Sequence, residues 1–568
     1  MSRDRLHGSA AWASAAEIAA AGLCRSPGLL FGHGPDGAAL LLDGDAPVLT
    51  AAGSGSGKGT SVIVPAILDY LGPLFVFDPK GENAALTLHH QHKLGKDAYC
   101  VNPFGLHRGP PWFLPTHNVN PLDVLTPGGD SLSLFADCKL VAEMLIPKHM
   151  NGGDDYWTLK PREIVFAVLF WQTVTEGSVD APRFYAVLTT IFSEPALWQR
   201  IVQELMAFPN VEVRRVIGEI EMKREKAGGE FSGIMGKLFE ALSFIADPAL
   251  SRCLRGGDFS LSALTEKRPA TVYLIVPGEY IKTYAPFIRL MVGVAMLYKS
   301  RRRASSRVVF LLDEASQLGH FEMLQKAFSF ERGGGVRTWA FFQSLGQIEE
   351  HYGRTGIQAF MESAQLRQFF GVGHPETARV VSDMLGVQTV FYDDPLYQTA
   401  HRQQALGFLL NGDSSPQVIL TAAAHLQQST LQSAAQRPLM LPDEILRLGL
   451  NQQICFVNGK TPALKPILGW RWPYYLRHDL AGSYLPNPDR PPYDRVEVAK
   501  RSGKSQQWRV WTHEVLPHLA GLPQFQQGMM SYAAKAPLLR AAKIGKDSGN
   551  GFLARTVRLF LPGPKAVS

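Results

Sequence analysis

Two kinds of hydrophobic pattern alternate along the 568 residues of this chain. Short, largely apolar runs occur at residues 75–77, 271–276, 308–312 and 338–342. Such runs, without alternating polar positions, are typical of parallel strands that are buried on both faces. Longer stretches between the runs carry apolar residues at helical spacing. The pattern therefore predicts an α/β protein.

One long stretch, from residue 131 to residue 262, lacks the strand pattern. Within 131–146, apolar residues recur every three or four positions, as one face of an amphipathic helix requires, and Pro147 follows. Similar patterns occur at 162–174, 197–208, 213–225 and 234–245. We interpret this stretch as all-helical, and its Met and Phe positions as packing positions.

Residues 47–60, PVLTAAGSGSGKGT, carry the strongest chemical signal: an apolar run, a glycine-rich loop and a lysine that begins a helical pattern. Small residues leave backbone N–H groups uncovered, and these groups hold phosphate beside a lysine and a helix N-terminus. The alternative interpretation is a Gly/Ser turn ahead of a helix. The expected nucleotide-binding residues are Gly53, Ser54, Gly55, Ser56, Gly57, Lys58, Gly59 and Thr60.

This loop departs from the pattern G-x-x-x-x-G-K-[ST] at two positions. Ala52 stands at the first glycine position, and Gly59 follows Lys58, which delays the hydroxyl group to Thr60. The hydroxyl group of this motif normally ligates Mg²⁺. Thr60 is therefore the expected metal ligand of the loop, on the condition that its side chain reaches the metal.

The run at 308–312 ends in two carboxylates, Asp313 and Glu314. In open α/β sheets, ligands lie beyond the carboxyl ends of the strands, so both side chains are expected near the phosphates. We expect Asp313 to hold Mg²⁺ through water, and Glu314 to polarise the water that attacks the γ-phosphate of ATP. The alternative is an acidic helix N-terminus that complements the helix dipole. The loop and the acidic strand each supply the context that the other requires.

Together with several other segments, these motifs resemble the TraG/TraD-type coupling proteins of type IV secretion and conjugation. The matching segments include VIVPAILDYLGPLFVFDPKGE at 62–82, FSFERGGGVRTWAFFQSLGQIEEHYG at 328–353, FFGVGHPETARVVSDMLG at 369–386 and RPLMLPDEILRL at 437–448. The similarity extends in family order over about residues 7–480. It implies a RecA-like P-loop ATPase that forms hexamers and translocates DNA.

The resemblance and the hydrophobic pattern together predict four parts. The RecA-like nucleotide-binding domain is expected in two segments, 1–130 and 263–486, with an inserted all-α domain at 131–262. A basic C-terminal extension is expected at 487–568.

In a ring of RecA-like subunits each nucleotide lies at an interface, so an arginine of the neighbouring subunit can stabilise the transferring phosphoryl group. The resemblance assigns this finger to Arg332 in the ERGGGVR motif, with Arg337 as the second candidate. A solvated loop arginine is the alternative for either residue. Gln343, which ends the run at 338–342, is expected to contact the γ-phosphate or its water. Its alternative role is to cap the next helix.

The segment Asp78–Glu82 follows the run at 75–77 and is expected at the ligand edge of the sheet. The resemblance implies that this DPKGE segment is a hallmark of the family. Its residues are equally consistent with a structural turn at Asp78-Pro79 and with catalysis.

The composition, with 46% hydrophobic and 19% charged residues, predicts a globular protein with a sizeable core. The five scattered cysteines form no C-x-x-C pair and the 16 histidines form no H-E-x-x-H motif, which favours a reducing cytoplasm without zinc chemistry. We find neither a secretory signal pattern nor a run of about 18 apolar residues. Since coupling proteins of this type carry an N-terminal membrane anchor, we expect an anchorless version, cytoplasmic and peripherally associated with the bacterial inner membrane.

Positive charge is concentrated near the C-terminus. The whole chain has a net charge of +7, whereas residues 487–568 contain 13 Lys and Arg against 5 Asp and Glu, a net of +8. Aromatic residues such as Trp508 and Trp511 lie among these basic residues. This mixture suits a polyanion, either nucleic acid or an anionic membrane surface. A solvated basic face or a tail that docks to a partner protein is the alternative.

The function implied by the resemblance is a coupling ATPase that uses ATP and Mg²⁺. It would recruit a single-stranded DNA–relaxase complex and translocate it toward a secretion channel, in contact with the channel ATPases and inner-membrane components. We expect a homo-hexamer when the protein is active and a monomer when it is free. Two alternatives remain open: the coupling of protein effectors without DNA, and a recruitment adaptor whose hydrolysis is impaired by Ala52 and Gly59.

Overall fold

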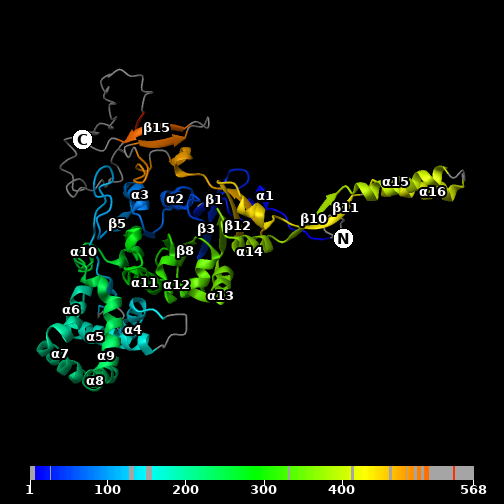
Figure 1. Ribbon diagram of the computed structural model, residues 1–568. Coiled ribbons are helices and arrows are strands. Elements are labelled where there is room, and N and C mark those ends of the chain that lie inside the picture. The colour runs from blue at the N-terminus through cyan, green and yellow to red at the C-terminus, as the bar shows by residue number, and fades with distance from the viewer. Residues whose placement is uncertain are drawn as a thin grey trace.

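An eleven-stranded sheet runs through the centre of the molecule (Figure 1). Its strand order is β2-β1-β13-β12-β9-β3-β8-β7-β4-β6-β5. The structure is a computed structural model that describes residues 7–25, 27–126, 133–148, 156–329, 333–410, 415–430, 432–459, 463–480, 483–491, 495–499, 505–510 and 541–543.

The strands from β9 to β5 in this order are parallel to one another. They are β3 (Val48–Ala52), β4 (Leu74–Asp78), β5 (Asp97–Val101), β6 (Ala270–Ile275), β7 (Val308–Leu312), β8 (Val336–Phe342) and β9 (Leu366–Phe370). Every residue of β3, β4, β6, β7 and β8 is buried, because helices cover both faces. The predicted α/β class is confirmed. The order also brings the carboxyl ends of β3, β8 and β7 side by side.

Antiparallel strands extend the sheet beyond β9. They are β1 (Leu29–His33), β2 (Ala39–Leu42), β12 (Gln452–Val457) and β13 (Ile467–Trp470). Strand β12 pairs with β9, and β13 pairs with β12. The C-terminal part of the chain is thereby separated only by β9 from β3, which leads into the glycine-rich loop.

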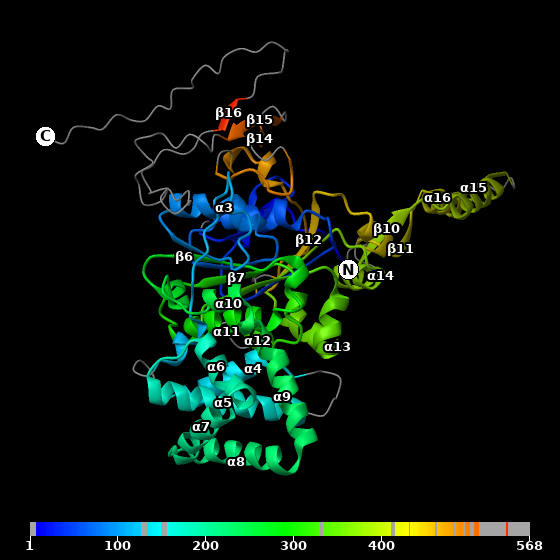
Figure 2. The ribbon, with the colours of Figure 1, turned by 60° about the vertical axis from the view of Figure 1, so that its left-hand side comes forward.

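Helices cover the two faces of the sheet (Figure 2). One face packs against α1 (Ala15–Ala20), α2 (Val64–Asp69) and α3 (Glu82–Lys93). The opposite face packs against α11 (Ala285–Arg301), α12 (Glu322–Ser329), α13 (Leu345–Ser363), α14 (Pro375–Leu385) and α17 (Pro442–Leu446). The side chains of each strand alternate between these two cores, as the pleat requires.

The α-helices between β5 and β6 gather at one end of the molecule (Figure 1). They are α4 (Leu134–Leu145), α5 (Tyr156–Glu176), α6 (Ala181–Ser193), α7 (Pro195–Ala207), α8 (Val211–Lys226), α9 (Gly228–Leu242) and α10 (Pro248–Cys253). The helices predicted from the spacing in 131–146 and 213–225 are α4 and α8. The domain boundaries themselves stay a prediction.

A long projection, here called the arm (residues 387–438), leaves the body after α14 (Figure 1). Strands β10 (Val387–Tyr392) and β11 (Ser433–Pro438) form an antiparallel ribbon, and the ribbon carries the helices α15 (Pro395–Leu410) and α16 (Pro416–Gln428). Residues 7–10 lie along its base, where the Ala10 N–H donates to the Val387 carbonyl at 2.9 Å. The hydrophobic pattern predicted no such projection.

Near the C-terminus, β14 (Arg495–Ala499), β15 (Ser505–Val510) and β16 (Ala541–Lys543) form a separate three-stranded sheet. The side chains of the predicted basic extension from residue 492 onward lie outside the described residues, so its proposed binding role stays a prediction. Within the described part of the chain, no helix combines the length and the apolar composition needed to cross a membrane.

Candidate functional site

The glycine-rich loop begins where β3 ends and leads into a π-helical turn, Gly59–Ile63, which continues as α2. Gly55 and Gly57 have φ angles of +71° and +85°, which glycine adopts without strain. No atom lies within 4 Å of the place where a Cβ of Gly55 or Gly59 would stand. The loop therefore combines an open backbone with a helix N-terminus, as phosphate binding requires.

Internal hydrogen bonds hold the loop in a fixed turn. The Ser56 hydroxyl donates to the Gly53 carbonyl at 2.6 Å, and the Ser61 hydroxyl donates to the Gly57 carbonyl at 2.7 Å. The Thr60 hydroxyl also donates to the Gly57 carbonyl, at 3.3 Å. Thr60 thus lies beside the loop, and its role as a metal ligand stays a prediction.

Four of the five predicted catalytic residues meet in one cluster. Lys58 Nζ lies 2.6 Å from Glu314 Oε1 and 3.9 Å from Asp313 Oδ1. Gln343 donates from Nε2 to Glu314 Oε2 at 3.0 Å. Lys58 follows the loop, the two carboxylates follow β7, and Gln343 follows β8. The strand order explains the cluster, because the carboxyl ends of neighbouring parallel strands meet at one edge.

Asp313 and Glu314 differ in environment although they are adjacent. Oδ1 of Asp313 is buried and has no hydrogen-bond partner among the described residues. Burial raises the pKa of Asp313 to about 6, and the nearby Lys58 ammonium opposes this rise. Glu314 is instead paired through both carboxylate oxygens.

Glu314 also has an unusual backbone conformation. Its φ and ψ angles are +61° and +50°, in the left-handed region, where a side chain costs about 1–2 kcal/mol. Strain of this kind persists where the surrounding structure imposes it, and it is common at functional sites. The left-handed turn between β7 and the next helical turn, Ala315–Leu318, directs Glu314 toward Lys58 and Gln343.

Of the two candidates for the arginine finger, the structure describes Arg337 but not Arg332. Arg332 lies outside the described residues. Arg337 is only 1% exposed and lies within β8, where it donates from Nη1 to the Leu42 carbonyl at 3.0 Å. A buried strand residue cannot reach into a neighbouring subunit, so Arg337 is excluded as the second candidate. Arg332 stays a prediction.

Gln343 does not cap the following helix with its side chain. Its amide group contacts Glu314, while its backbone N–H donates to Oε1 of Gln347 at 2.8 Å. Because its side chain contacts Glu314, Gln343 does not have the alternative role of a helix cap. Its expected role near the γ-phosphate stays a prediction.

Asp78 in the DPKGE segment has a structural role. The buried carboxylate accepts from the Ala84 N–H at 2.8 Å and from the Asn83 side chain at 3.3 Å, at the start of α3. Burial raises the pKa of Asp78 to about 7. These contacts favour the turn interpretation of this segment over direct catalysis.

The cluster fits a magnesium nucleotide. The uncovered loop backbone and Lys58 supply positive potential for phosphates, and Asp313 offers a carboxylate oxygen with no other partner among the described residues. Hard cations such as Mg²⁺ prefer carboxylate oxygens and water as ligands. Among the described residues, only Glu314 holds Lys58 by a short ion pair, and that pair can be exchanged for a phosphate.

Two residues at this site were missed by sequence reasoning. The Gly371 carbonyl, after β9, accepts from the Gly53 N–H at 3.1 Å. Arg471, after β13, donates to the Ser56 carbonyl at 3.0 Å. Gly371 could have been found from the pair Gly371-x-Gly373 after an apolar run, whereas nothing in the spacing points to Arg471.

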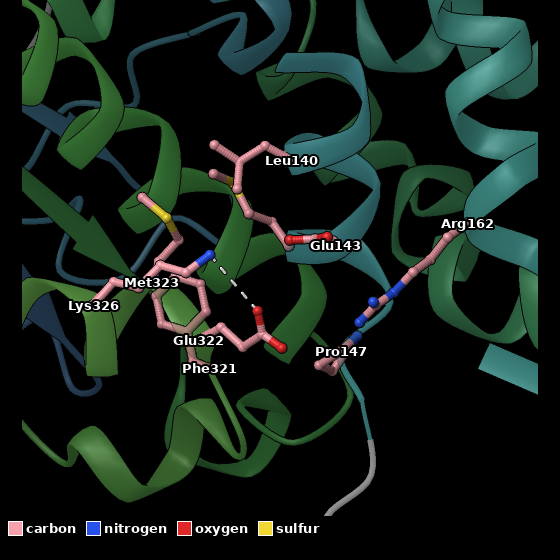
Figure 3. A pocket seen from close by; sticks show the side chains of 9 residues that line it. Leu140, Glu143, Pro147, Arg162, Phe321, Glu322, Met323 and Lys326 are labelled. Atoms are coloured by element: carbon pink, nitrogen blue, oxygen red, sulfur yellow. Dashed lines mark ion pairs between the residues drawn. The ribbon is translucent and has the colours of Figure 1, made fainter. Parts of the chain in front are cut away.

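A small cavity between α4 and α12 lies away from this cluster (Figure 3). Leu140 and Glu143 line it from α4, and Glu322 and Lys326 line it from α12. It holds about 10 Å³, which leaves room for one water molecule at most. This cavity is part of the packing between the helical region and the sheet.

The profile of the family described as "Type IV secretory system Conjugative DNA transfer" matches residues 11–487. The chain belongs to this family. The match includes the glycine-rich loop, the acidic strand end and Gln343, and it also covers the arm. The resemblance inferred from the motifs is confirmed.

Among curated relatives, the chain is similar to the type IV secretion system-coupling protein VirD4 of Bartonella quintana, with 26% identity over 460 residues. It is also similar to the conjugal transfer protein TraG of Rhizobium radiobacter, with 24% identity over 461 residues. These alignments cover 78% of this chain in both cases, and 66% and 64% of the relatives. The chain therefore spans slightly less than two thirds of the length of these relatives.

Solved structures show the same fold. The bacterial conjugative coupling protein TrwB, truncated at its N-terminus and unbound, matches with a TM-score of 0.55 and 15% identity, over 81% of this chain and 92% of that chain. TrwB in complex with ADP and Mg²⁺ matches with a TM-score of 0.54 and 15% identity, over 80% and 91%. The predicted RecA-like fold is confirmed by this likeness.

Proposed function

We propose that this chain is the motor part of a coupling ATPase, which uses ATP hydrolysis to recruit and translocate a single-stranded DNA–relaxase complex toward a type IV secretion channel. The observation that carries the proposal is the cluster at the carboxyl edge of the sheet. It joins Lys58, Glu314 and Gln343 beside the carboxylate of Asp313, whose Oδ1 has no hydrogen-bond partner among the described residues.

Each residue has a separate task in this proposal. Lys58 and the loop N–H groups bind the phosphates of ATP, and Asp313, with Thr60, holds Mg²⁺. When Lys58 moves to the phosphates, Glu314 loses its partner at 2.6 Å and becomes free to accept a proton from the attacking water. ATP with its Mg²⁺ supplies the transferable phosphoryl group.

Two further roles concern the response to the nucleotide. Gln343 already contacts Glu314, so a change in the position of Glu314 is transmitted to β8 and α13. Arg332 completes the site of the neighbouring subunit as an arginine finger, in a homo-hexamer that forms when the protein is active. The free chain is a monomer that hydrolyses ATP slowly.

A second, larger cavity supports the proposal that the substrate is nucleic acid. This open groove of about 1,000 Å³ lies between α4, α5 and α9 on one side and α11 and α13, which cover the sheet, on the other. Its lining includes Lys148, Lys237, Lys282 and Arg289, against the acidic residues Glu240 and Glu350. An excess of positive charge in a groove attracts a phosphate backbone. TrwB is described as a conjugative and plasmid coupling protein, which agrees with this substrate class.

The remaining partners follow from the same proposal. A coupling ATPase works at the bacterial inner membrane, so the chain would act on its cytoplasmic side, beside the ATPases and inner-membrane components of the channel. Coupling of protein effectors is the nearest alternative. An adaptor with weak hydrolysis is favoured by one observation, the hydroxyl group of Thr60 displaced by one position and bonded to the Gly57 carbonyl.

The deciding experiment is the ATPase rate of the purified chain with and without single-stranded DNA. We expect DNA to raise the rate, and Glu314→Gln to lower it by orders of magnitude while nucleotide binding persists. Lys58→Ala should instead weaken binding. Normal hydrolysis in Glu314→Gln would contradict the assignment of Glu314.

A paired variant separates the substrates. Lys237→Glu with Lys282→Glu should abolish the stimulation by DNA and leave the basal rate intact, since neither residue contacts the nucleotide cluster. The matched control, Lys226→Glu, changes a basic residue of α8 outside the groove. Hydrolysis that never responds to DNA would favour protein effectors, and no hydrolysis at all would favour the adaptor.

A further inference from the structure

Arg471 lies directly after β13, in the antiparallel part of the sheet, yet its side chain reaches the glycine-rich loop. The residue is 1% exposed. It stands outside every motif that indicated the nucleotide site. A buried guanidinium carries a large desolvation cost, which only several well-placed acceptors offset.

The guanidinium group meets both ends of the turn that precedes α2. Nη1 donates to the Ser56 carbonyl at 3.0 Å and to the Ser61 hydroxyl at 2.8 Å. The other nitrogens anchor the group to its own region: Nε donates to the Gln452 carbonyl at 3.3 Å, and Nη2 donates to the Leu450 carbonyl. Arg471 thus ties the loop to the backbone around β12.

The contact with Ser56 fixes one peptide plane of the loop. In a trans peptide the carbonyl and the following N–H point in opposite directions. Because Arg471 holds the Ser56 carbonyl on one side of the loop, the N–H of Gly57 is directed to the other side. A hydrogen bond from a charged donor also polarises the peptide, which makes this N–H a better donor.

Strand β9 supports the arrangement from a second direction. The guanidinium stacks on the ring of Phe370, with 3.7 Å between Cζ of Arg471 and the ring centroid. The next residue, Gly371, accepts from the Gly53 N–H. A Cβ on Gly371 would stand 2.3 Å from Cβ of Ser56, so the loop and β9 are in close contact. The loop is therefore held at its first glycine by β9 and at its centre by Arg471.

We propose that Arg471 is a positioning residue that holds the glycine-rich loop in its phosphate-binding conformation before the nucleotide arrives. This inference rests on the proposed function as an ATP-binding protein and extends it to a residue 410 positions beyond Ser61. Arg471 acts on nucleotide affinity, because it orders the loop and does not face the reacting atoms. Its loss leaves the chemical step at saturating ATP nearly unchanged.

The experiment compares Arg471→Met and Arg471→Lys with the wild-type chain. The dissociation constant of Mg²⁺·ADP is measured by titration calorimetry, and KM and kcat for ATP are measured well below the melting temperature of each variant. Loss of charge-assisted hydrogen bonds predicts a rise of about 10- to 100-fold in the dissociation constant and in KM for Arg471→Met. Arg471→Lys restores part of the affinity, and kcat changes less than about twofold.

Arg477→Met is the matched control. Arg477 is another poorly exposed arginine of the same segment, but it pairs with Asp69 and Asp479 and does not contact the loop. Its loss should lower stability without raising the dissociation constant. Arg471→Lys, which keeps the charge but not the full set of hydrogen bonds, should give a smaller rise and serves if Arg471→Met does not fold.

The outcomes separate this inference from the proposed function. A wild-type chain that binds no nucleotide would overturn both. Tight binding by the wild type, with equal dissociation constants in Arg471→Met and Arg477→Met, would overturn the positioning role alone. A fall in kcat without a rise in KM would also overturn it.

Discussion

In the proposed nucleotide site, side chains and backbone groups from distant segments meet: the loop after β3, the ends of β7, β8 and β9, and Arg471. The arm is held differently. Its helices α15 and α16 pack on each other, and Nδ1 of His401 lies 2.9 Å from Nδ1 of His425 between them. Apart from residues 7–10 at its base, the contacts described for the arm ribbon and helices are mainly local.

The two regions also differ in where their apolar side chains lie. The strands that lead to the site are buried, whereas the arm exposes large apolar residues in both helices. Leu396, Leu410 and Leu420 are 84%, 81% and 75% exposed. Apolar residues thus form a packed core in one region and an exposed surface in the other. The difference lies in the topology that surrounds each segment.

The largest effect is expected when the glycine-rich loop loses its fit against the end of β9, one of the distant segments that hold it. Gly371→Ala places a Cβ at 2.3 Å from Cβ of Ser56, at a φ of +53°, so the loop must move. Because the displaced loop binds the phosphates of ATP less tightly, we expect the ATPase rate at ATP concentrations far below KM to fall by about 10- to 100-fold. Gly373→Ala, where nothing lies within 4 Å, is the control and should behave as wild type. Equal rates for both variants would contradict the tight contact.

A second test measures how the affinity for Mg²⁺·ADP depends on pH. The pKa of Asp313 is raised to about 6, so its carboxylate becomes protonated as the pH falls through this value, and a protonated group cannot hold Mg²⁺. We expect the affinity for Mg²⁺·ADP to fall below pH 6, by up to about tenfold per unit. Asp313→Asn should bind more weakly at pH 7.5 and lack this part of the pH dependence. The same pH profile for both proteins, measured by calorimetry, would show that another group titrates.

A third test concerns the strained backbone of Glu314. Glu314→Gly and Glu314→Ala both remove the carboxylate, but only alanine keeps the cost of a Cβ at a φ of +61°. The glycine variant should be more stable by about 1 kcal/mol. Urea unfolding of both variants without nucleotide measures the difference. Equal stability would mean that the backbone relaxes out of the left-handed region once the ion pair with Lys58 is lost.

The smallest expected effect comes from the arm. Joining β10 to β11 by a short Gly-Ser turn removes residues 393–432, whose helices contact mainly each other. The dissociation constant of Mg²⁺·ADP and the basal ATPase rate should stay within about twofold of wild type. Loss of nucleotide binding would show that the arm stabilises the core. It would contradict the conclusion that the arm is held mainly by its own local contacts.

Sequence reasoning succeeded where the chemistry is concentrated in short segments. The loop at 53–60, the pair Asp313-Glu314 and Gln343 each follow an apolar run, and parallel strands bring such positions to one edge. Their contacts with one another follow from strand order. Their catalytic roles stay predictions.

The rest depends on tertiary structure that no local pattern carries. Arg337 follows a glycine-rich turn and reads as a loop residue, but β8 begins at Val336 and buries it. The left-handed conformation of Glu314 is imposed by its surroundings, since the side chain itself disfavours it. In the arm, the apolar residues of α15 and α16 do not form one buried stripe, so the pattern indicated neither a core nor a projection.

The position of β3 in the sheet has a consequence for protein synthesis. Val48 of β3 pairs with Trp339 of β8 on one side and with Leu366 of β9 on the other. At a synthesis rate of about 5–20 residues per second, the partners of β3 leave the ribosome roughly 15–60 s after β3 itself. Until then β3 has no partner strand, and the glycine-rich loop lacks the contact of Gly53 with the Gly371 carbonyl. The proposed nucleotide site is therefore complete only after most of the protein has been made, so ATP cannot act as a folding ligand for the early nascent chain.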